Sequence, residues 1–293
     1  MQIAVASGKG GTGKTTVATN LAYVASRNDR TVAYLDCDVE EPNGGLFLHP
    51  DMEERRPVRV SIPAVDLSLC SACGTCGEIC QYSAIVPMNE KVLVFPELCH
   101  GCAGCWLACP TGAVTESHRT TGQLETGRAE GVQFAQGVLN IGEIMSPPVI
   151  ANVKESAPEA ELLILDAPPG TSCPVIETVR DADFVLLVTE PTPFGLNDLK
   201  LAVEMVRALE LPAAIVINRA EGTESETHVW CRNEGLEIIA EIPDDREVAE
   251  LYSHGALAAK HVPAYQKVFA ELLERTETML AGMQSGASGR VPA

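Results

Sequence analysis

Short apolar runs and helical patterns alternate at the start of the chain. Residues 2–6 form one apolar run, and residues 31–35 form a second that ends beside Asp36. Between them lie a glycine-rich stretch over residues 7–14 and residues 15–27, whose apolar positions recur at helical spacing. Buried strands of parallel sheets are typically continuous apolar runs. The order strand, loop, helix, strand therefore predicts the beginning of a parallel α/β sheet.

The same pattern returns in the second half of the chain. Apolar runs predict further buried strands at residues 162–166, 184–190, 213–219 and 236–242. Helical spacing predicts helices at about 195–209, 223–234 and 263–282. We therefore expect an α/β fold with a mostly parallel sheet and helices on both faces.

The middle of the chain departs from this pattern. Residues 49–59 are polar and contain proline, which predicts a connector, and residues 60–118 hold most of the cysteines and few charges. The simplest organisation is one α/β domain interrupted by an inserted module. We expect an α/β domain over 1–58 and 119–284, a small α+β insertion over 59–118, and a flexible tail over 285–293.

Composition and charge narrow the classes of function. Apolar residues make up 46% and charged residues 21% of the 293 residues, a mixture typical of globular proteins. The formal net charge of −19 opposes binding to nucleic acid and to anionic membranes. We find neither an apolar run of about eighteen residues nor a signal-peptide pattern, so we expect a cytoplasmic protein. Because disulfides are rare in the cytoplasm, the 11 cysteines favour metal binding.

The glycine-rich stretch matches the phosphate-binding pattern GxxxxGK(S/T) between a predicted strand and a predicted helix. The match consists of Gly8, Lys9, Gly10, Gly11, Thr12, Gly13, Lys14 and Thr15. Backbone amides of such a loop converge on phosphate oxygens, and the helix N-terminus favours negative charge. We expect Lys14 to reach the β- and γ-phosphates, Thr15 to bind Mg²⁺ and Thr16 to contact the α-phosphate. The alternative is a glycine-rich turn without a ligand.

An additional lysine within this loop points to a particular family. With Lys9, the sequence KGGTGKTT resembles the deviant Walker A loop of the MinD/Mrp/ParA superfamily, which includes the nitrogenase iron protein. The resemblance implies a P-loop ATPase that binds ATP or ADP with Mg²⁺. It also implies that Lys9 reaches the nucleotide of a partner subunit, in an ATP-dependent homodimer or a heterodimer with a related ATPase. The alternative for Lys9 is a solvated loop lysine.

Acidic residues at predicted strand ends extend the resemblance. Asp36 and Asp38 match the family's Asp-x-Asp, which implies that Asp36 lies near Mg²⁺ through water and that Asp38 orients the attacking water. Asp166 ends LLILDAPPG, which resembles the Walker B strand and switch II, and it would hold a Mg²⁺-bound water. A carboxylate at the ligand-binding edge of an open α/β sheet is a site candidate on physical grounds as well. The alternative is a set of solvated acids that end strands.

Two weaker matches concern the base of the nucleotide. Asn218 matches a strand-end asparagine that contacts adenine in the family, and Pro243-Asp244 matches a second base-side loop. Asparagine also often caps a strand or a turn.

The resemblance thus assigns catalysis to Lys9, Lys14 and Asp38, with hydrolysis by water as the reaction.

The cysteines form an internal repeat with an offset of 29 residues. Two runs of the form CxxCxxCxxxC begin at Cys70 and Cys99, and this spacing resembles bacterial ferredoxins with two 4Fe-4S clusters. The resemblance implies one cluster on Cys70, Cys73, Cys76 and Cys109, and the other on Cys99, Cys102, Cys105 and Cys80. Paired zinc sites are the alternative. We expect Cys37 to face the core, Cys231 to be structural and Cys173 to be a small buried thiol. The alternative for Cys173 is that it ligates a metal or responds to the redox state.

Together the motifs predict an ATP-hydrolysing nucleotide switch coupled to two 4Fe-4S clusters. The expected role is ATP-gated electron transfer, or redox-responsive action on an unidentified protein partner. The alternative is an iron-sulfur cluster carrier or assembly ATPase. A positioning ATPase of the MinD/ParA kind is a third possibility, which the net charge and the lack of a basic amphipathic anchor disfavour.

Overall fold

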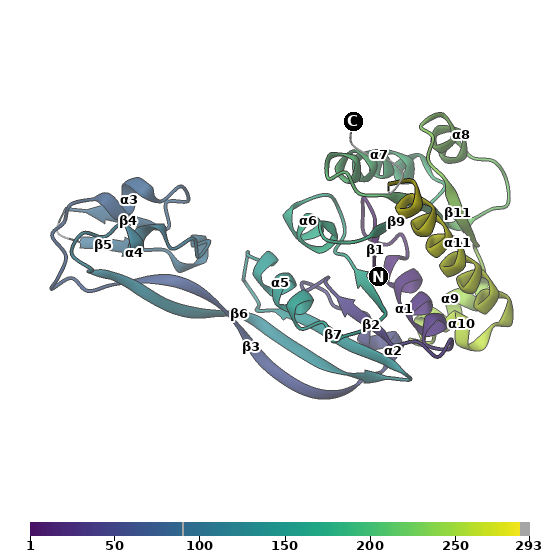
Figure 1. Cartoon of the computed structure of the whole chain (residues 1–293), viewed down its shortest axis with the longest axis horizontal. Coiled ribbons are helices and arrows are strands. Elements are labelled where there is room, and N and C mark those ends of the chain that lie inside the picture. Colours follow the sequence, from purple (N-terminus) through teal and green to yellow (C-terminus); the bar gives the residue numbers. More distant parts are fainter. Residues whose placement is uncertain (90, 288–293) are drawn as a thin grey trace. The chain divides into compact units, whose positions relative to one another are not determined.

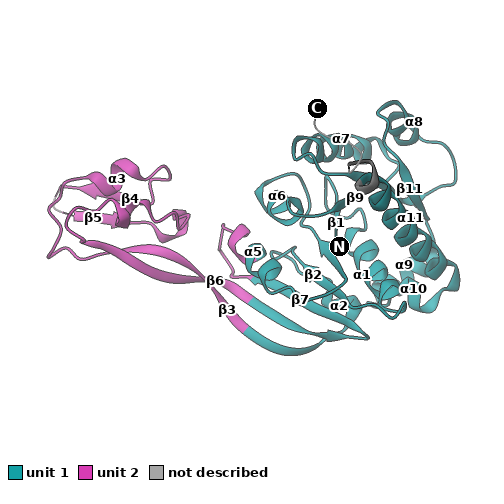
Figure 2. Ribbon diagram, in the orientation of Figure 1, with its two compact units in different colours: residues 1–55, 124–138, 150–293 teal, residues 56–123, 139–149 magenta. Residues whose placement is uncertain are grey.

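The computed structural model describes residues 1–89 and 91–287, and the chain divides into two compact units (Figure 2). Unit 1 comprises Met1–Arg55, Leu124–Val138 and the residues from Ile150 onward. Unit 2 comprises Arg56–Gln123 and Leu139–Val149. Unit 2 thus extends beyond both ends of the predicted insertion and includes a second, separate segment. Of the predicted tail, residues 285–287 belong to the last helix, and residues 288–293 lie outside the described part.

A nine-stranded sheet forms the framework of unit 1, in the order β11-β10-β9-β1-β8-β2-β7-β6-β3 (Figure 1). Its strands are β1 (Gln2–Ala6), β2 (Val32–Asp36), β3 (Asp51–Val65), β6 (Val114–Ala129), β7 (Val132–Leu139), β8 (Leu162–Asp166), β9 (Phe184–Thr189), β10 (Ala213–Ala220) and β11 (Ile238–Pro243). From β11 to β7 every printed pairing is parallel. The mostly parallel α/β sheet is therefore confirmed.

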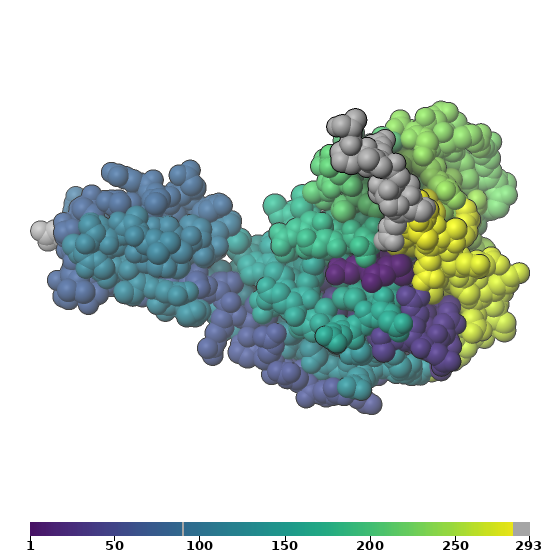
Figure 3. All heavy atoms as spheres, viewed as in Figure 1, coloured from purple at the N-terminus to yellow at the C-terminus, as the bar shows by residue number. Residues whose placement is uncertain are grey.

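Helices bury both faces of the central strands. They are α1 (Lys14–Ala25), α2 (Gly45–Leu48), α5 (Pro147–Glu155), α6 (Cys173–Val179), α7 (Pro193–Ala208), α8 (Glu226–Asn233), α9 (Arg246–Ser253), α10 (Ala258–His261) and α11 (Pro263–Ala287). In Figures 1 and 3 the purple α1 and the yellow α11 lie side by side although they are at opposite ends of the sequence. On the other face, α6 packs on β1 and α7 on β9. All six residues of β9 are buried, as expected for a strand covered on both sides.

Three strands depart from the sequence prediction. The expected connector over 49–59 lies largely in β3, and β6 and β7 were not predicted at all. These strands lie at one edge of the sheet, where solvent-facing positions tolerate polar residues and proline. Glu130 and Gly131, both with positive φ (43° and 91°), form the tight turn between β6 and β7. These strands lack the continuous apolar runs on which the prediction rested.

Unit 2 contains short elements around the cysteines. They are α3 (Thr75–Ile79), β4 (Ile85–Met88), β5 (Lys91–Val94), the 3-10 helix Pro96–Leu98 and α4 (Gly104–Leu107). Strands β4 and β5 pair antiparallel, and α3 and α4 each follow a residue with positive φ, Gly74 and Ala103. The two helices correspond to each other in the cysteine repeat. A small apolar cluster holds Ile85 and Val114 beside the buried Cys76 and Cys105.

Candidate functional site

The glycine-rich loop connects β1 to α1 in a conformation that its glycines make possible. Gly11 and Gly13 have φ values of +79° and +93°, which favour glycine. A Cβ on Gly8 would lie 2.1 Å from the backbone oxygen of Asp198, and one on Gly13 would lie 2.2 Å from Asn218 Nδ2. The loop is therefore packed closely against α7 and the end of β10.

A cavity of about 1240 Å³, counting its solvent-open part, extends from this loop. It brings together predicted residues from separate parts of the chain: Gly10, Gly11, Gly13, Lys14, Thr15, Thr16, Asp38, Asn218, Pro243 and Asp244. Its size and mixed lining suit a small-molecule ligand. The predicted Gly8, Lys9, Thr12, Asp36 and Asp166 are not among its lining residues. Gly8, Lys9 and Thr12 belong to the loop itself, and Asp36 and Asp166 are buried at the ends of β2 and β8.

The sequence analysis missed the apolar side of this cavity. Tyr252, Tyr265 and Phe269, from α9 and α11, line this side, and the charged Arg219 of β10 also lines the cavity. No local motif marks these residues, because they become neighbours of the loop only when the last helices pack beside α1. The helical pattern of the last segment was the available signal, but it did not indicate which side chains reach the cavity.

Two predicted carboxylates lie side by side at the ends of β2 and β8. Asp36 and Asp166 are paired in the strand register and both are buried. Asp36 accepts backbone hydrogen bonds from Gly44 (2.7 Å) and Asp38 (3.2 Å). The buried Asp166 Oδ1 and the buried Thr12 Oγ1 have no hydrogen-bond partner among the described residues. Free oxygen atoms of this kind fit Mg²⁺ and its water shell.

Burial dominates the electrostatics of the acids. Burial raises the pKa of Asp36 well above its usual value and also raises the pKa of Asp166. Burial, with the neighbouring Asp166, raises the pKa of Asp38 to about 6. Burial lowers the pKa of Lys14, although the three carboxylates act in the opposite direction. A divalent cation would favour the ionised form of all three acids.

Lys9 is held within its own chain. Its Nζ lies 3.6 Å from Glu190 Oε2, and Arg219 Nη1 lies 2.5 Å from the other oxygen, Oε1. The Glu190 side chain is only 12% exposed, whereas that of Lys9 is 32% exposed. Glu190 at the end of β9 was not singled out from the sequence.

Asn218 has a contact that the sequence did not indicate. Its Nδ2 donates to the carbonyl oxygen of Thr12 at 2.8 Å. This hydrogen bond ties the end of β10 to the phosphate loop and explains why a side chain at Gly13 would not fit. Asn218 therefore lines the cavity and also supports the loop.

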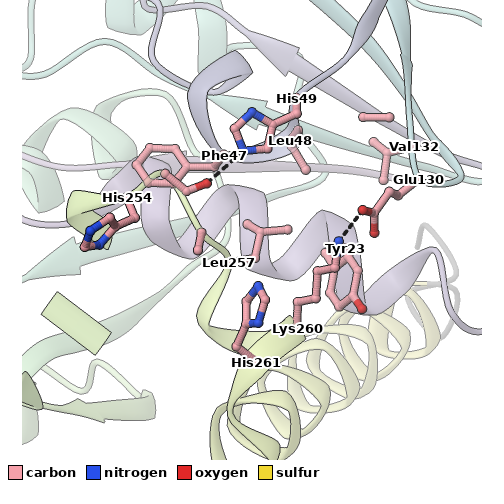
Figure 4. A pocket seen from close by; sticks show the side chains of 13 residues that line it. Tyr23, Phe47, Leu48, His49, Glu130, Val132, His254, Leu257, Lys260 and His261 are labelled. Carbon is pink, nitrogen blue, oxygen red and sulfur yellow. Dashed lines mark hydrogen bonds and ion pairs between the residues drawn. The ribbon is translucent and has the colours of Figure 1, made fainter. Parts of the chain in front are cut away.

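A smaller cavity of about 470 Å³, open solvent included, lies in unit 1 between the α2 segment and α10 (Figure 4). His49 Nε2 lies 3.1 Å from the carbonyl oxygen of Gly255, and Lys260 forms an ion pair with Glu130. Phe47, which lines this cavity, packs on Tyr252 of the larger cavity with ring centroids 4.9 Å apart. The contact connects the segment after Asp38 to α9.

In unit 2 the eight repeat cysteines line two separate cavities. One, of about 370 Å³ with open solvent included, is lined by Cys70, Cys73, Cys76 and Cys109 among others. The other, of about 340 Å³, is lined by Cys80, Cys99, Cys102 and Cys105 among others. The described residues contain no group of three or more His, Cys, Asp or Glu side chains placed to hold a metal ion. Each cavity nevertheless combines three cysteines of one run with the last cysteine of the other.

Backbone amides converge on the last cysteine of each run. The Val114 amide leads a group of hydrogen bonds that lowers the pKa of Cys109 to about 7. The amides of Tyr82, Ala84 and neighbouring residues outweigh burial and lower the pKa of Cys80. Amide hydrogen bonds favour thiolate, the form that binds iron. Burial raises the pKa of Cys76 and raises that of Cys105 to about 11, so the lowered values concern one cysteine of each cavity. Each cavity has four cysteines, the number of sulfur ligands that a 4Fe-4S cluster requires.

The three remaining cysteines differ in exposure. Cys37 and Cys231 are buried, as expected for structural thiols. Cys173 is exposed at the first position of α6, so the expectation that it is a small buried residue is wrong. The reason is its place three residues after Gly170, in the segment that follows the carboxyl end of β8, where Ser172 is exposed as well.

The parallel sheet, the glycine-rich loop after its first strand and the helix that this loop opens define the class of P-loop nucleotide-binding proteins. Residues 3–258 match the family described as the CobQ/CobB/MinD/ParA nucleotide binding domain. The chain belongs to this family and is a nucleotide-binding protein of the MinD/ParA ATPase class. Among the described residues, no helix has the length and apolar character needed to span a membrane.

Similar proteins cover nearly the whole chain. An uncharacterized protein of Methanocaldococcus jannaschii is 33% identical over 285 residues, which is 96% of this chain and 98% of that protein. An iron-sulfur cluster carrier protein of Pyrococcus horikoshii is 24% identical over 297 residues, 94% of this chain and 84% of that one. The structure of the septum site-determining protein MinD with Mg-ADP from Pyrococcus horikoshii shares the fold, with a TM-score of 0.61 and 21% identity, covering 96% of this chain and 97% of that one.

Proposed function

We propose that this protein is a Mg²⁺-dependent, ATP-hydrolysing switch of the deviant Walker A class that carries two 4Fe-4S clusters in unit 2. One observation carries the proposal: each cysteine cavity combines three thiols of one run with the fourth of the other. This is the crossed ligand pattern of two-cluster ferredoxins. The P-loop cavity of unit 1 supports the nucleotide half.

The residues of unit 1 have separate tasks in this proposal. Backbone amides of the glycine loop and Lys14 neutralise the phosphates of ATP, and Thr15 offers its hydroxyl to Mg²⁺. Asp36 and Asp166 would hold water molecules bound to Mg²⁺, and Asp38, which lines the cavity, would orient the attacking water. Bound Mg²⁺ supplies charge neutralisation at the transferred phosphoryl group. Lys9 acts across an ATP-dependent dimer, either with a second copy or with a related ATPase.

The residues of unit 2 hold and tune the clusters. Cysteine thiolates ligate iron, and the amides that converge on Cys80 and Cys109 stabilise the negative charge on sulfur. The clusters supply one-electron chemistry when bound. Because each cavity contains cysteines of both runs, cluster binding would link the two halves of unit 2 to each other.

The order of elements supports coupling between the two activities. Asp36 ends β2 and Asp38 lies two residues beyond it, and the segment that follows passes through α2 into β3. Strand β3 begins in unit 1 and continues into unit 2. A change at the carboxylates is therefore transmitted along a continuous piece of chain that leads to the first cysteine run. ATP-gated electron transfer to a protein partner, or redox-responsive action on it, follows from this coupling.

A second function, delivery of iron-sulfur clusters, is favoured by the names of related proteins. Relatives at 22–25% identity in Pyrococcus, Aquifex and Methanocaldococcus species are named iron-sulfur cluster carrier proteins. Four cysteine ligands for each cluster oppose easy release, so we place electron transfer first. A positioning role would rest on a shared fold alone, because the MinD structures are about 21–22% identical or less.

The test is anaerobic purification followed by iron and sulfide analysis and electron paramagnetic resonance with and without Mg-ATP. We expect about eight irons and eight sulfides per chain, and a spectral or redox change that requires ATP hydrolysis. Lys14→Ala should retain the clusters and lose at least about 100-fold in hydrolysis rate. Zinc without sulfide would overturn the cluster assignment. Transfer of iron to an apo-acceptor upon ATP addition would establish the carrier function instead.

A further inference from the structure

Tyr34 is a buried polar residue of β2 that the proposed mechanism does not yet use. Its side chain is completely buried, and its Oη donates to Asp166 Oδ2 at 2.8 Å. The ring stacks on Phe134 of β7, with centroids 5.7 Å apart and an interplanar angle of 15°. Because the ring is packed on this side, the hydroxyl has a fixed position relative to the carboxylate.

The strand register explains how the hydroxyl reaches its partner. Tyr34 pairs with Ile164, and Asp36 pairs with Asp166 on the neighbouring strand. Residues two apart on a strand face the same side, so Tyr34 is a diagonal neighbour of Asp166. Its hydroxyl bonds to Oδ2, whereas the other oxygen, Oδ1, is buried and has no hydrogen-bond partner in the described part of the chain. The Thr15 hydroxyl lies near the same carboxylate and, with Lys14 and Tyr34, counteracts the rise that burial causes in the pKa of Asp166.

The segment after β2 is shaped around the same hydroxyl. A Cβ on Gly44 would lie 2.3 Å from Tyr34 Oη, so only glycine allows the backbone to pass at this position. The same residue donates its backbone N–H to Asp36 Oδ2 at 2.7 Å. Tyr34 thus contacts the Asp166 carboxylate while lying against the loop that holds Asp36.

We propose that Tyr34 is a positioning residue for Asp166, which fixes the carboxylate so that Oδ1 faces the water shell of Mg²⁺. A carboxylate with one oxygen bonded to a fixed donor loses its freedom to rotate, and its free oxygen keeps one direction. Tyr34 touches neither metal nor nucleotide and acts through Asp166. This inference rests on the proposed Mg²⁺-dependent nucleotide function.

The first test compares Tyr34→Phe with the wild-type protein by titrating Mg²⁺ against binding of a fluorescent ADP. The substitution keeps the ring and removes only the hydroxyl. We expect the half-saturating Mg²⁺ concentration to rise by about 5- to 10-fold, with ADP affinity in the absence of Mg²⁺ changed by less than about 2-fold. In hydrolysis, kcat should fall while KM for ATP changes little.

The second test repeats the substitution in an Asp166→Asn background. If Tyr34 acts through Asp166, Tyr34→Phe should change the Mg²⁺ requirement there by less than about 2-fold. An equal effect in both backgrounds, or no effect in the wild-type background, would overturn the inference. Should Tyr34→Phe alone fail to fold, the double variant, in which no buried charge lacks its donor, is compared with Asp166→Asn by thermal unfolding. If the double variant folds although Tyr34→Phe alone does not, the result supports the pairing of Tyr34 with Asp166. If the double variant is unfolded while Asp166→Asn is folded, the pairing is rejected.

The wild-type control separates this inference from the proposed function. Wild-type protein that binds ADP without any dependence on Mg²⁺ would overturn both. Wild-type protein that depends on Mg²⁺, with a Tyr34→Phe variant that behaves identically, would overturn only the role of Tyr34.

Discussion

At the scale of single residues, Glu190 decides where Lys9 points. Its largely buried carboxylate pairs with both Lys9 and Arg219, so the loop lysine is retained by its own chain. A lysine that completes a partner's site must leave this ion pair. Exposed or partly exposed ion pairs contribute about 0.2–1 kcal/mol, which is small enough to break upon ATP binding.

Glu190→Gln should therefore favour the closed dimer. Releasing Lys9 should lower the dimer dissociation constant with ATP by about 2- to 5-fold, since this is the loss of a weak ion pair. Light scattering against protein concentration, with ATP or ADP, measures the change. Arg219→Gln, which removes the other partner of Glu190, is the matched control and should not strengthen the dimer. An unchanged dimer dissociation constant in Glu190→Gln would show that the ion pair with Glu190 does not restrain Lys9.

Asp38 gives the site a pH dependence. Its pKa is raised to about 6, about two pH units above the usual value for an aspartate. The carboxylate is therefore still mostly ionised at pH 7. If ionised Asp38 orients water, kcat/KM should fall as pH decreases through about 6 and be level above about 7, because kcat/KM reports the free enzyme. A profile measured from pH 5 to 8 tests this. In Asp38→Asn the low residual kcat/KM should no longer decrease at acid pH. A wild-type kcat/KM that stays constant down to pH 5 would contradict the role of ionised Asp38 in orienting water.

At the scale of elements, the two cysteine runs are similar units, and each contributes its last cysteine to the cavity of the other. Each places a short helix, α3 or α4, after a residue with positive φ. Each also receives its fourth cysteine from the other run, at Cys109 or Cys80. Neither cysteine run alone therefore supplies all four cysteines of a cavity.

Substitution of the crossed cysteines should remove clusters individually. Cys109→Ser should lower the iron content from about eight to about four per chain, because it removes one ligand of one cavity only. Cys80→Ser should have the same effect on the other cavity, with a different residual spectrum. Cys173→Ser, at an exposed thiol outside both cavities, is the control with full iron content. Full iron content in Cys109→Ser would contradict the ligand assignment.

At the scale of the whole molecule, the two units differ in what stabilises them. Unit 1 has a large apolar core in which the sheet packs against α1 and α11. The apolar cluster around Ile85 and Val114 in unit 2 is small and includes cysteines of both runs. Domains with small cores depend on bound metal for their folding.

Hydrogen exchange should show which unit is stabilised by the clusters and which by the nucleotide. Removal of the clusters with a chelator under anaerobic conditions should abolish protection in residues 75–107 and leave β1 and β8 protected. Mg-ADP at about 100 times its dissociation constant should stabilise unit 1 by about 2.7 kcal/mol and protect the phosphate loop. Loss of protection in β1 and β8 upon cluster removal would show that unit 1 depends on the clusters as well.

The sequence by itself determined the features that are local. Buried central strands such as β1, β8 and β9 are continuous apolar runs, and the phosphate loop has fixed spacing because its backbone must wrap a phosphate. The cysteine runs likewise carry their own spacing. These patterns predicted the mostly parallel sheet, the phosphate loop that borders the larger cavity, and the eight cysteines that line the two cavities of unit 2.

The tertiary structure decided what depends on distant partners. Strands β3 and β6 are largely polar and β7 is interrupted by glutamines, so only pairing in the sheet reveals them. The bond from Tyr34 to Asp166, the restraint of Lys9 by Glu190 and the apolar wall from α9 and α11 join residues far apart in the sequence. Their individual residue types carry no local signal. The physical reason is that a hydrogen bond or an ion pair requires two groups in contact, and contact between distant segments exists only in the folded chain.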